Sequence, residues 1–554
     1  MDSARVQRET DYPRTPMQVH AEDNFCRDAL PPRHLWPAMD YIGAPEVVYP
    51  ARLNCGAELL DAHVASGKGE QAAFHHAGRQ WTYSQIWQLA NRIAHVLVGD
   101  FRLIPGSRVL LRGTNHPWLV AAWYAVIKAG CVVVCTPALL RVRELVPIIR
   151  KARINLCVTD AALAAECDES VVVAGGGIPV VRFNTSEPLS LEERVANKDG
   201  NFDNHDTAAD DVAIIAFTSG TTGDPKGTMH FHRDLLAVSD CFGRRIVNAS
   251  AKDIFCGTPP LAFTFALGGL LLFPMRIGAS TVLLEQGTPQ HLLEAIETYR
   301  ATICFTSPTG YRAMLGMLGH FDISCLRQCI SAGEPLPLNT FQTWERMTGL
   351  RIMDGIGSTE LLHIFVSARE EEVRPGSLGK AVPGYKVCVL DENGVPVLPG
   401  IVGRLAVRGP TGCRYLADVE QQRQYVQQQW NITGDACRID EDGYVWYVAR
   451  TDDMIVSSGY KIAAPEIEGV LLEHPKVGEC AVVGVPDVAR GQIVKAFVVV
   501  KDNVVASDDL EKELQSFVKS KIAPFKYPRA IKFIDRLPRT ATGKLQRHIL
   551  RGNG

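Results

Sequence analysis

The chain has 554 residues, of which 46% are hydrophobic and 21% charged, and its formal net charge is −3. This length exceeds what one hydrophobic core usually organises, so we expect two or more domains of an ordinary globular protein. The small net charge gives no electrostatic reason to expect nucleic acid or an anionic membrane as a partner.

The N-terminus and the cysteines indicate where the protein resides. Residues 1–16 are polar and carry charges of both signs, without the apolar core of a signal peptide. No run of about 18 or more apolar residues occurs, which argues against a membrane-spanning helix. The 15 cysteines are scattered, with no Cys-x-x-Cys pair, as is typical of buried packing in a reducing compartment. We therefore predict a cytoplasmic protein that does not bind a membrane.

Strands and helices alternate in the first part of the chain. Residues 1–55 are expected to form an irregular leader with short helical pieces. Apolar residues recur at helical spacing over residues 85–98, so one face of this helix should pack on a core. Two short apolar strands, 108–111 and 131–135, flank a predicted helix at 117–129. This β–α–β order favours a parallel sheet.

The polar, acidic segment 185–211 is interpreted as a surface connection that leads to a buried strand at 212–217. The α/β alternation then continues, with a helix expected at 289–299 and strands at 281–284, 302–305 and 350–353. From about residue 377, short strands separated by turns predict a mainly β subdomain, with strands at 386–390, 403–408 and 444–448. Beyond Arg450 we expect a further unit with helices at 466–473 and 508–521 and strands at 480–485, 496–500 and 531–534.

The stretch at residues 218–227, Thr-Ser-Gly-Thr-Thr-Gly-Asp-Pro-Lys-Gly, is the strongest indication of function. Glycines allow a tight turn, and backbone N–H groups beside hydroxyl donors form a site for anionic oxygens. Lys226 adds a compact positive charge suited to phosphate. The common P-loop is excluded, because Pro225 precedes the lysine and Gly227 follows it. We predict a loop that holds the outer phosphates of a nucleotide; an ordinary polar turn is the alternative.

This loop resembles the signature loop of the adenylate-forming superfamily, which includes acyl-CoA synthetases, adenylation domains of peptide synthetases and luciferases. The resemblance implies that the loop binds nucleotide through Thr218, Ser219, Gly220, Thr221, Thr222, Gly223 and Lys226.

Further stretches resemble motifs of the same superfamily and follow in the family's order. Residues 331–337 resemble its adenine-side loop, and residues 354–360 resemble the turn that flanks adenine and ends in a Mg²⁺-contacting glutamate, here Glu360. Mg²⁺ prefers carboxylate oxygen together with phosphate oxygens. Residues 433–435 resemble the ribose-binding turn, and Arg450 would meet ribose or phosphate. The other nucleotide-binding residues implied in this way are Ala332, Gly333, Glu334, Asp354, Gly355, Ile356, Gly357, Thr359 and Asp435.

The end of the chain resembles the family's small domain and its hinge. The resemblance makes Asp452 the hinge and places Gly459 and Tyr460 on the path of coenzyme A. Some relatives carry a lysine where this chain has Val456, so no catalyst of thioester formation is assigned there. The sequence Pro-Arg-Thr-Ala-Thr-Gly-Lys at 538–544 implies that its lysine acts in adenylation. The catalytic residues implied are Thr221, Glu360 and Lys544.

A narrower resemblance concerns the acid that is activated. Residues 355–365, Gly-Ile-Gly-Ser-Thr-Glu-Leu-Leu-His-Ile-Phe, look like the benzoate-CoA ligase branch. The leader at 23–37 resembles the 2-aminobenzoate-CoA ligases within that branch. The aryl pocket implied consists of Phe263, Phe265, Gly333, Gly357 and His363. Core packing is the alternative for the two phenylalanines.

The resemblance as a whole implies a fold and a reaction. The fold has a large N-terminal domain, residues 1–451, of two α/β sheet subdomains and a small β subdomain, followed by a small mobile α+β domain, residues 452–554. The reaction is the ATP- and Mg²⁺-dependent activation of an aromatic acid, of 2-aminobenzoate or benzoate type, as acyl-AMP and its transfer to coenzyme A. Transfer to a carrier protein and a non-catalytic nucleotide-binding module are the alternatives. A homodimer is left open.

Overall fold

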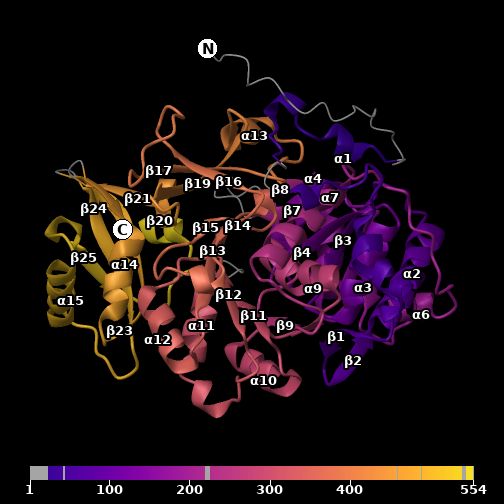
Figure 1. Ribbon diagram of the computed structural model, residues 1–554, viewed down its shortest axis with the longest axis horizontal. Coiled ribbons are helices and arrows are strands. Elements are labelled where there is room, and N and C mark those ends of the chain that lie inside the picture. The colour runs from indigo at the N-terminus through magenta and orange to yellow at the C-terminus, as the bar shows by residue number, and fades with distance from the viewer. Residues whose placement is uncertain are drawn as a thin grey trace.

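The computed structural model describes residues 23–40, 44–218, 225–457, 460–487, 490–539 and 545–552. Four sheets form its framework (Figure 1). A six-stranded and a nine-stranded sheet form the body of the large N-terminal domain, and a five-stranded sheet follows them. Another five-stranded sheet forms the small C-terminal domain. The predicted α/β and α+β fold class is therefore confirmed.

The six-stranded sheet has the strand order β6-β5-β3-β4-β7-β8. All of its neighbouring strands are parallel except β8, which turns back antiparallel to β7. The strands are β3 (Arg108–Arg112), β4 (Val132–Thr136), β5 (Leu156–Asp160), β6 (Val180–Phe183), β7 (Val212–Thr218) and β8 (Lys226–Phe231).

Helices cover both faces of this sheet. Side chains of α4 and α5 pack on one face, and those of α2 and α3 pack on the other. The side chain and backbone of Thr82 and Gln85 form reciprocal bonds at the start of α2, which satisfies N–H groups that the helix itself leaves unpaired. The helices are α2 (Tyr83–His95), α3 (Pro117–Lys128), α4 (Val142–Ala152), α5 (Ala164–Ala174), α6 (Leu191–Val195) and α7 (His232–Val238).

The nine-stranded sheet has the order β15-β14-β13-β12-β11-β9-β10-β1-β2, with antiparallel strands at its two ends. Its strands are β1 (Ala72–His76), β2 (Arg79–Thr82), β9 (Ile254–Gly257), β10 (Ser280–Val282), β11 (Ile303–Thr306), β12 (Gln328–Ala332), β13 (Ile352–Gly357), β14 (Ile364–Ser367) and β15 (Lys380–Ala381). Its helices are α8 (Thr264–Ala266), α9 (Phe273–Ile277), α10 (Pro289–Tyr299), α11 (Pro308–Met314) and α12 (Leu338–Thr348). Helices α10 to α12 cover one face, and the other face shares the largest apolar cluster with α2 and α3.

The third sheet is antiparallel and follows the two α/β sheets. It contains β16 (Lys386–Leu390), β17 (Gly403–Arg408), β18 (Val426–Gln427), β19 (Trp430–Ile439) and β20 (Val445–Arg450), with α13 (Val419–Tyr425) beside it. The small domain consists of β21 (Met454–Ser457), β22 (Tyr460–Ala463), β23 (Val477–Asp487), β24 (Gly491–Val500), β25 (Ala530–Phe533), α14 (Ala464–Glu473), α15 (Asp508–Lys521) and α16 (Arg547–Gly552).

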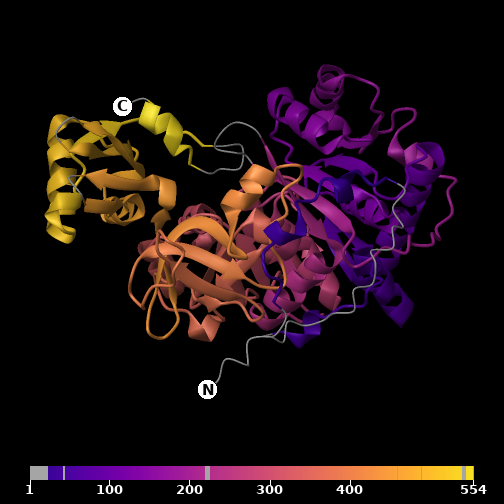
Figure 2. The ribbon, with the colours of Figure 1, turned by 90° about the horizontal axis from the view of Figure 1, so that it is seen from above.

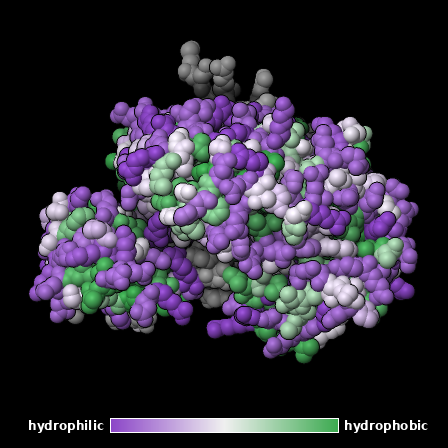
Figure 3. Space-filling view, turned by 90° about the horizontal axis from the view of Figure 1, so that it is seen from below, coloured by the Kyte–Doolittle hydropathy of each residue, from purple (hydrophilic) through white to green (hydrophobic). Residues whose placement is uncertain are grey.

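The small domain stands at one end of the molecule (Figure 2). Seen from below, it forms a separate lobe with a furrow between it and the large domain (Figure 3). Within the described ranges, no helix has both the length and the apolar content needed to cross a membrane.

Most predicted elements are confirmed, and one prediction needs correction. The helices expected at 289–299 and 508–521 are α10 and α15, and the β–α–β order at 108–135 does form parallel neighbours. The segment at 185–211 was expected to be a surface connection, but it contains α6, whose Leu191 and Val195 are buried. This short amphipathic helix lies among acidic residues, and its apolar side chains pack on the core of the large domain.

The leader, which includes α1 (Phe25–Asp28), is fastened to the large domain around a buried ion pair. Arg414 donates to the carboxylate of Asp234 at 2.9 Å, and both side chains are 0% exposed. The Arg414 guanidinium also lies 4.0 Å from the ring centre of Phe231 and 5.0 Å from that of Trp36 in the leader. The leader, β8, α7 and the segment before α13 therefore meet at one charged, desolvated contact.

Arg414→Ala should strongly destabilise the large domain, because it leaves the Asp234 carboxylate buried without its cation. Breaking a buried pair in this way typically costs about 3–5 kcal/mol. Chemical denaturation followed by tryptophan fluorescence measures this loss.

Arg374→Ala is the matched control, because Arg374 bonds to Asp442 at the surface with a side chain that is 42% exposed. Surface ion pairs contribute little to stability. Equal losses for the two variants would contradict the importance of the buried pair.

Candidate active site

The predicted phosphate loop connects two paired strands. Thr218 ends β7, Lys226 begins β8, and the two residues are paired in the antiparallel ladder. Lys151 of α4 donates to the carbonyl of Pro225 at 3.0 Å, which fixes the backbone where the loop enters β8. The other loop residues of the prediction, Ser219, Gly220, Thr221, Thr222 and Gly223, lie outside the described residues.

The two predicted adenine-side segments lie next to each other, because they follow neighbouring parallel strands. Ala332 at the end of β12 pairs with Gly355 in β13. Gly333 has φ of +100° and is exposed, which lets the chain turn away from the sheet. Glu334 then turns back, and its Oε1 accepts from the backbone N–H of Thr309 at 2.8 Å. Residues far apart in sequence thus form one edge of a candidate nucleotide site.

Asp354 at this edge has an unusual carboxyl group. Burial raises the pKa of Asp354 to about 7, and the charge of Glu334 acts in the same direction. Its Oδ1 is buried and has no hydrogen-bond partner among the described residues. Near neutral pH this group is therefore only partly ionised, and it can donate or accept a hydrogen bond.

Glu360 lies in a short helical turn, Thr359–Leu361, directly after β13. Its side chain is half-buried, and Oε1 accepts from the hydroxyl of Tyr415 at 2.6 Å. One partly exposed carboxylate, in a turn that is hydrogen-bonded to β8, fits a divalent cation that takes its remaining ligands from nucleotide phosphates and water. Glu360 could therefore hold Mg²⁺, and its role as the metal ligand stays a prediction.

Asp435 and Arg450 pair with each other across β19 and β20. Arg450 donates through Nη1 to Oδ1 of Asp435 at 3.0 Å and to the carbonyl of Thr433 at 2.9 Å. The two predicted ribose-site residues are thus brought together, and Asp435 is the more buried of the two side chains.

The connection to the small domain is short. Asp452 lies in the turn Thr451–Asp453 between β20 and β21. Tyr460, the first residue of β22, is 54% exposed and stacks on Phe525 with ring centres 4.4 Å apart. Gly459 and Lys544, predicted for the coenzyme A path and for adenylation, lie outside the described residues.

Three of the predicted aryl-pocket residues meet behind β13. The His363 ring lies 5.8 Å from that of Phe265, and its Nε2 is 3.2 Å from the Phe265 carbonyl oxygen. Burial lowers the pKa of His363 to about 3, so the ring is neutral and Nε2 carries the proton that it donates. A Cβ at position 357 would lie 2.6 Å from the His363 carbonyl oxygen, so only glycine fits there. Phe263 is half-buried and precedes α8.

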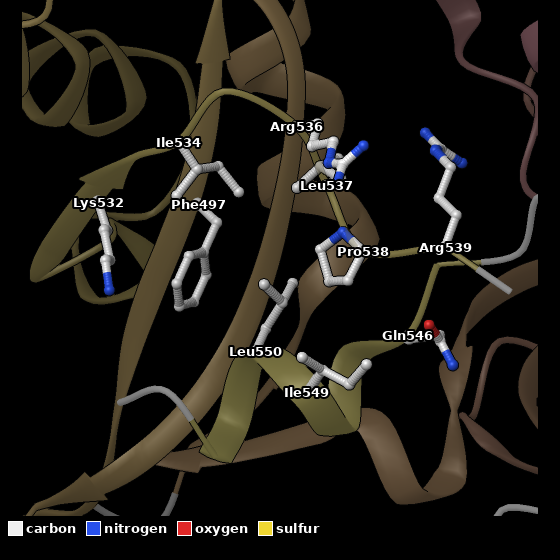
Figure 4. Close-up of a pocket in the computed structure, with 10 residues that line it drawn as sticks. All are labelled: Phe497, Lys532, Ile534, Arg536, Leu537, Pro538, Arg539, Gln546, Ile549 and Leu550. Atoms are coloured by element: carbon white, nitrogen blue, oxygen red, sulfur yellow. The ribbon is translucent and has the colours of Figure 1, made fainter.

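Two cavities lie near the small domain. The larger, of about 590 Å³, is lined entirely by small-domain residues and by none of the predicted site residues (Figure 4). The smaller, of about 440 Å³, has Asp354 and Tyr447 of the large domain on one side and Pro465 and Glu466 of the small domain on the other. The candidate nucleotide site therefore adjoins the junction of the two domains.

His76, His116 and Glu285 form the one cluster of possible metal-binding side chains found in the described part of the chain. His116 Nδ1 accepts from the backbone N–H of Trp118 and caps α3, and His76 Nε2 lies 2.8 Å from Glu285 Oε1. A ring that accepts at Nδ1 carries its proton at Nε2, so it offers no lone pair to a cation. We interpret the cluster as a contact between the nine-stranded sheet and the start of α3.

Three further residues near the candidate site were not predicted from the sequence: Tyr415, His230 and Arg414. Tyr415 bonds directly to Glu360, and His230 Nε2 lies 2.8 Å from the carbonyl oxygen of Thr359. Burial lowers the pKa of His230 to about 4, so this nitrogen donates from a neutral ring. None of the three residues stands in a stretch with a chemical pattern of its own, and only their long-range contacts reveal them.

Known proteins are similar to this chain over nearly its whole length. A family model described as AMP-binding enzyme matches residues 61–415, and one described as AMP-binding enzyme C-terminal domain matches residues 466–544. The benzoate–CoA ligase of Thauera aromatica is 33% identical, with 92% of this chain and 97% of that protein covered.

Solved structures of two similar proteins cover the same extent. The anthranilate CoA ligase AuaEII in complex with anthranoyl-AMP has a TM-score of 0.87 and 32% identity, covering 91% of this chain and 98% of that one. A benzoate CoA ligase from Burkholderia xenovorans LB400 has a TM-score of 0.82 and 31% identity, covering 90% and 100%.

Asp354 should make stability depend on pH. Its carboxyl has a pKa of about 7 when folded, against 3.8 for an ordinary Asp, so the folded state holds a proton that the unfolded state releases between these values. The stabilisation is therefore complete below about pH 4 and is lost as pH rises towards 7. The melting temperature of the wild type relative to Asp354→Asn should fall over this interval.

Melting curves of both proteins from pH 5 to 8 measure the difference. Glu441→Gln, at an exposed position before β20, controls for the loss of one carboxylate. A constant difference between the wild type and Asp354→Asn across this range would show that Asp354 does not take up the proton.

Proposed function

The chain belongs to the AMP-binding enzyme family and is an AMP-forming acid–CoA ligase, and from this premise we propose that its acid is a small aromatic carboxylate of the 2-aminobenzoate or benzoate type. ATP and coenzyme A are the other two substrates. Relatives named for benzoate and for anthranilate, each covered over nine-tenths or more of its length, support this choice of acid.

One arrangement supports the proposed binding of ATP and a cation. The strand β8, which starts at Lys226 of the phosphate loop, reaches the turn of Glu360 through the bond from His230 to Thr359. The same turn follows β13, whose pairing with β12 places the adenine-side segments beside it. Groups suited to phosphates, to a cation and to a base therefore converge from two sheets.

In the first half of the reaction, an oxygen of the aromatic carboxylate attacks the α-phosphorus of ATP. The bond to the bridging oxygen breaks, and acyl-AMP and pyrophosphate result. Residues 218–227 would hold the β- and γ-phosphates, with Lys226 as a fixed positive charge. Ala332, Gly333, Glu334 and residues 354–359 would enclose the base, and Asp435 would accept from the ribose hydroxyls.

Charge grows on the phosphoryl oxygens as this step proceeds, so fixed positive groups accelerate it. Lys544 is proposed to act there, with Thr221 of the phosphate loop. Glu360 would hold Mg²⁺, and the chemistry that the bound ion supplies is neutralisation of phosphate charge.

In the second half, the thiol of coenzyme A attacks the acyl carbonyl, loses its proton, and displaces AMP. Gly459 and Tyr460 are proposed to line its path. Lys544, proposed for the first step, and Gly459, proposed for the second, both lie after Arg450 in the small domain. Each half-reaction would therefore need a different face of this domain at the active site. We propose a domain boundary at residues 451 and 452 and a rotation about Asp452 between the two steps.

The proposal of an aromatic acid rests on the rings of Phe265 and His363, which contact each other. Phe265, a half-buried ring packed against the neutral His363, would offer a flat apolar face, against which an aromatic ring packs in an edge or offset geometry. Phe263, Gly333 and Gly357 would complete the pocket. A pocket sized for one aromatic ring would reject long acyl chains through overpacking.

A panel of acids tests this proposal. Benzoate or 2-aminobenzoate should exceed decanoate in kcat/KM by about 100-fold or more, because several extra methylenes must be accommodated. Pyrophosphate release with saturating ATP and coenzyme A measures each acid.

Similar kcat/KM values for decanoate and the aryl acids would contradict the aromatic pocket. Replacing free coenzyme A by a carrier protein in the same assay tests the alternative acceptor. Thioester formation with the carrier protein alone would favour that alternative.

Lys544→Ala should slow the formation of acyl-AMP by about 10²–10³-fold, the usual cost of removing one group that stabilises transition-state charge. Thioester formation from supplied acyl-AMP should remain largely intact, because in that step the nucleophile attacks the acyl carbon and no phosphoryl transition state forms. Single-turnover assays of the two half-reactions give both rates.

The control is Lys512→Ala, which removes an exposed lysine from α15 in the same domain. An equal loss in both half-reactions of Lys544→Ala would place its effect on folding or on a shared step.

A further inference from the structure

We propose that Tyr415 is a positioning residue that holds the Glu360 carboxylate in place for a nucleotide-bound divalent cation. The inference rests on the proposed role of Glu360 and adds the group that orients it. Its basis is the set of contacts that fix the Glu360 turn from outside its own strand.

The backbone of the turn is fixed on both sides of Glu360. The neutral His230 of β8 donates to the carbonyl of Thr359 at 2.8 Å. Thr411 Oγ1 donates to the carbonyl of Leu361 at 2.8 Å. A short turn with both flanking carbonyls engaged cannot swing as a loop, so the remaining freedom of Glu360 lies in its side chain.

The hydroxyl of Tyr415 restrains the side chain of Glu360. The hydroxyl donates to Oε1 of Glu360 at 2.6 Å, and this is the one hydrogen bond of the carboxylate within the described ranges. Oε1 is therefore occupied by a neutral donor, and Oε2 is left for a cation. A donor that fixes one oxygen of a ligating carboxylate is a common means of orienting a metal ligand.

Tyr415 itself is held from several directions. It is 2% exposed, its N–H donates to Oε1 of Gln422 at 2.9 Å, and its backbone forms a bridge with Thr228 of β8. Its ring meets that of Tyr425 edge to face, with centres 5.8 Å apart. The hydroxyl is thus placed by backbone and ring contacts that do not depend on Glu360.

The segment of Tyr415 also runs along the strand that begins at the phosphate loop. Leu416 donates its N–H to the carbonyl of Gly227 at 2.8 Å, and the adjacent Arg414 forms the buried ion pair with Asp234. Tyr415 therefore sets the distance between the Glu360 carboxylate and the start of β8. A cation that bridges carboxylate and phosphates requires this spacing.

Tyr415→Phe tests the inference, because it removes the hydroxyl and keeps the ring against Tyr425. The Mg²⁺ concentration at half-saturation should rise about 10–100-fold, and Mn²⁺ binding in the presence of ATP, followed by electron paramagnetic resonance, should weaken by the same factor. Activity at saturating Mg²⁺ should recover most of the wild-type value. A purely structural role would lower activity without moving the metal constants.

Tyr425→Phe is the matched control. The Tyr425 hydroxyl lies 3.2 Å from Ser358 Oγ and makes no bond to Glu360. Its metal constants should equal those of the wild type. All titrations are run below the melting transition of each variant, so that the constants refer to folded protein.

Glu360→Gln separates this inference from the proposed function. Weaker Mn²⁺ binding in Glu360→Gln together with unchanged binding in Tyr415→Phe would overturn the positioning role alone. Unchanged binding in Glu360→Gln would overturn the proposed role of Glu360, and the positioning role with it.

Discussion

The buried ion pair between Arg414 and Asp234 is the contact on which the geometry of the candidate site depends. Two fully desolvated charges are tolerated only when they face each other, so the pair fixes how the segment before α13 crosses β8 and α7. Trp36 of the leader packs on the same guanidinium. The next residue is Tyr415, and its restrained backbone directs its hydroxyl to Glu360. The Arg414–Asp234 ion pair thus helps to align the Glu360 carboxylate, which is distant in sequence.

Parallel strand order explains why the candidate residues gather where they do. In β12 and β13 the carboxyl ends lie side by side, so the segments that follow them must leave the sheet at the same edge. In the other α/β sheet, the pairing of β7 with the antiparallel β8 places Lys226 beside the carboxyl end of β7. Because both sheets share one apolar core, their relative position is set by packing and not by the loops.

The sequence predicted the α/β sheets and the order of the motifs, because buried parallel strands are short apolar runs and the phosphate loop has a composition of its own. It did not predict β14 or the reversal at β8, since an antiparallel edge has no pattern that distinguishes it from a parallel neighbour. Glu360 was identified from its motif, but Tyr415 was not: it lies 55 positions away, and only the folded chain makes them partners. Long-range hydrogen bonds leave no local trace in sequence.

The contacts around residue 452 divide between the two domains. Thr451 Oγ1 donates to the carbonyl of Gly434 in the large domain at 3.1 Å, and Arg450 is bonded to Asp435 there. The carboxylate of Asp453 instead pairs with Arg551 and lies 3.9 Å from Arg547, both on α16 of the small domain. The backbone of residue 452 therefore connects residues 450–451, which are bonded to the large domain, with Asp453, which is bonded to the small domain. A rotation centred there would break neither set of contacts, which supports the proposed hinge and explains how a domain could turn without unfolding its ends.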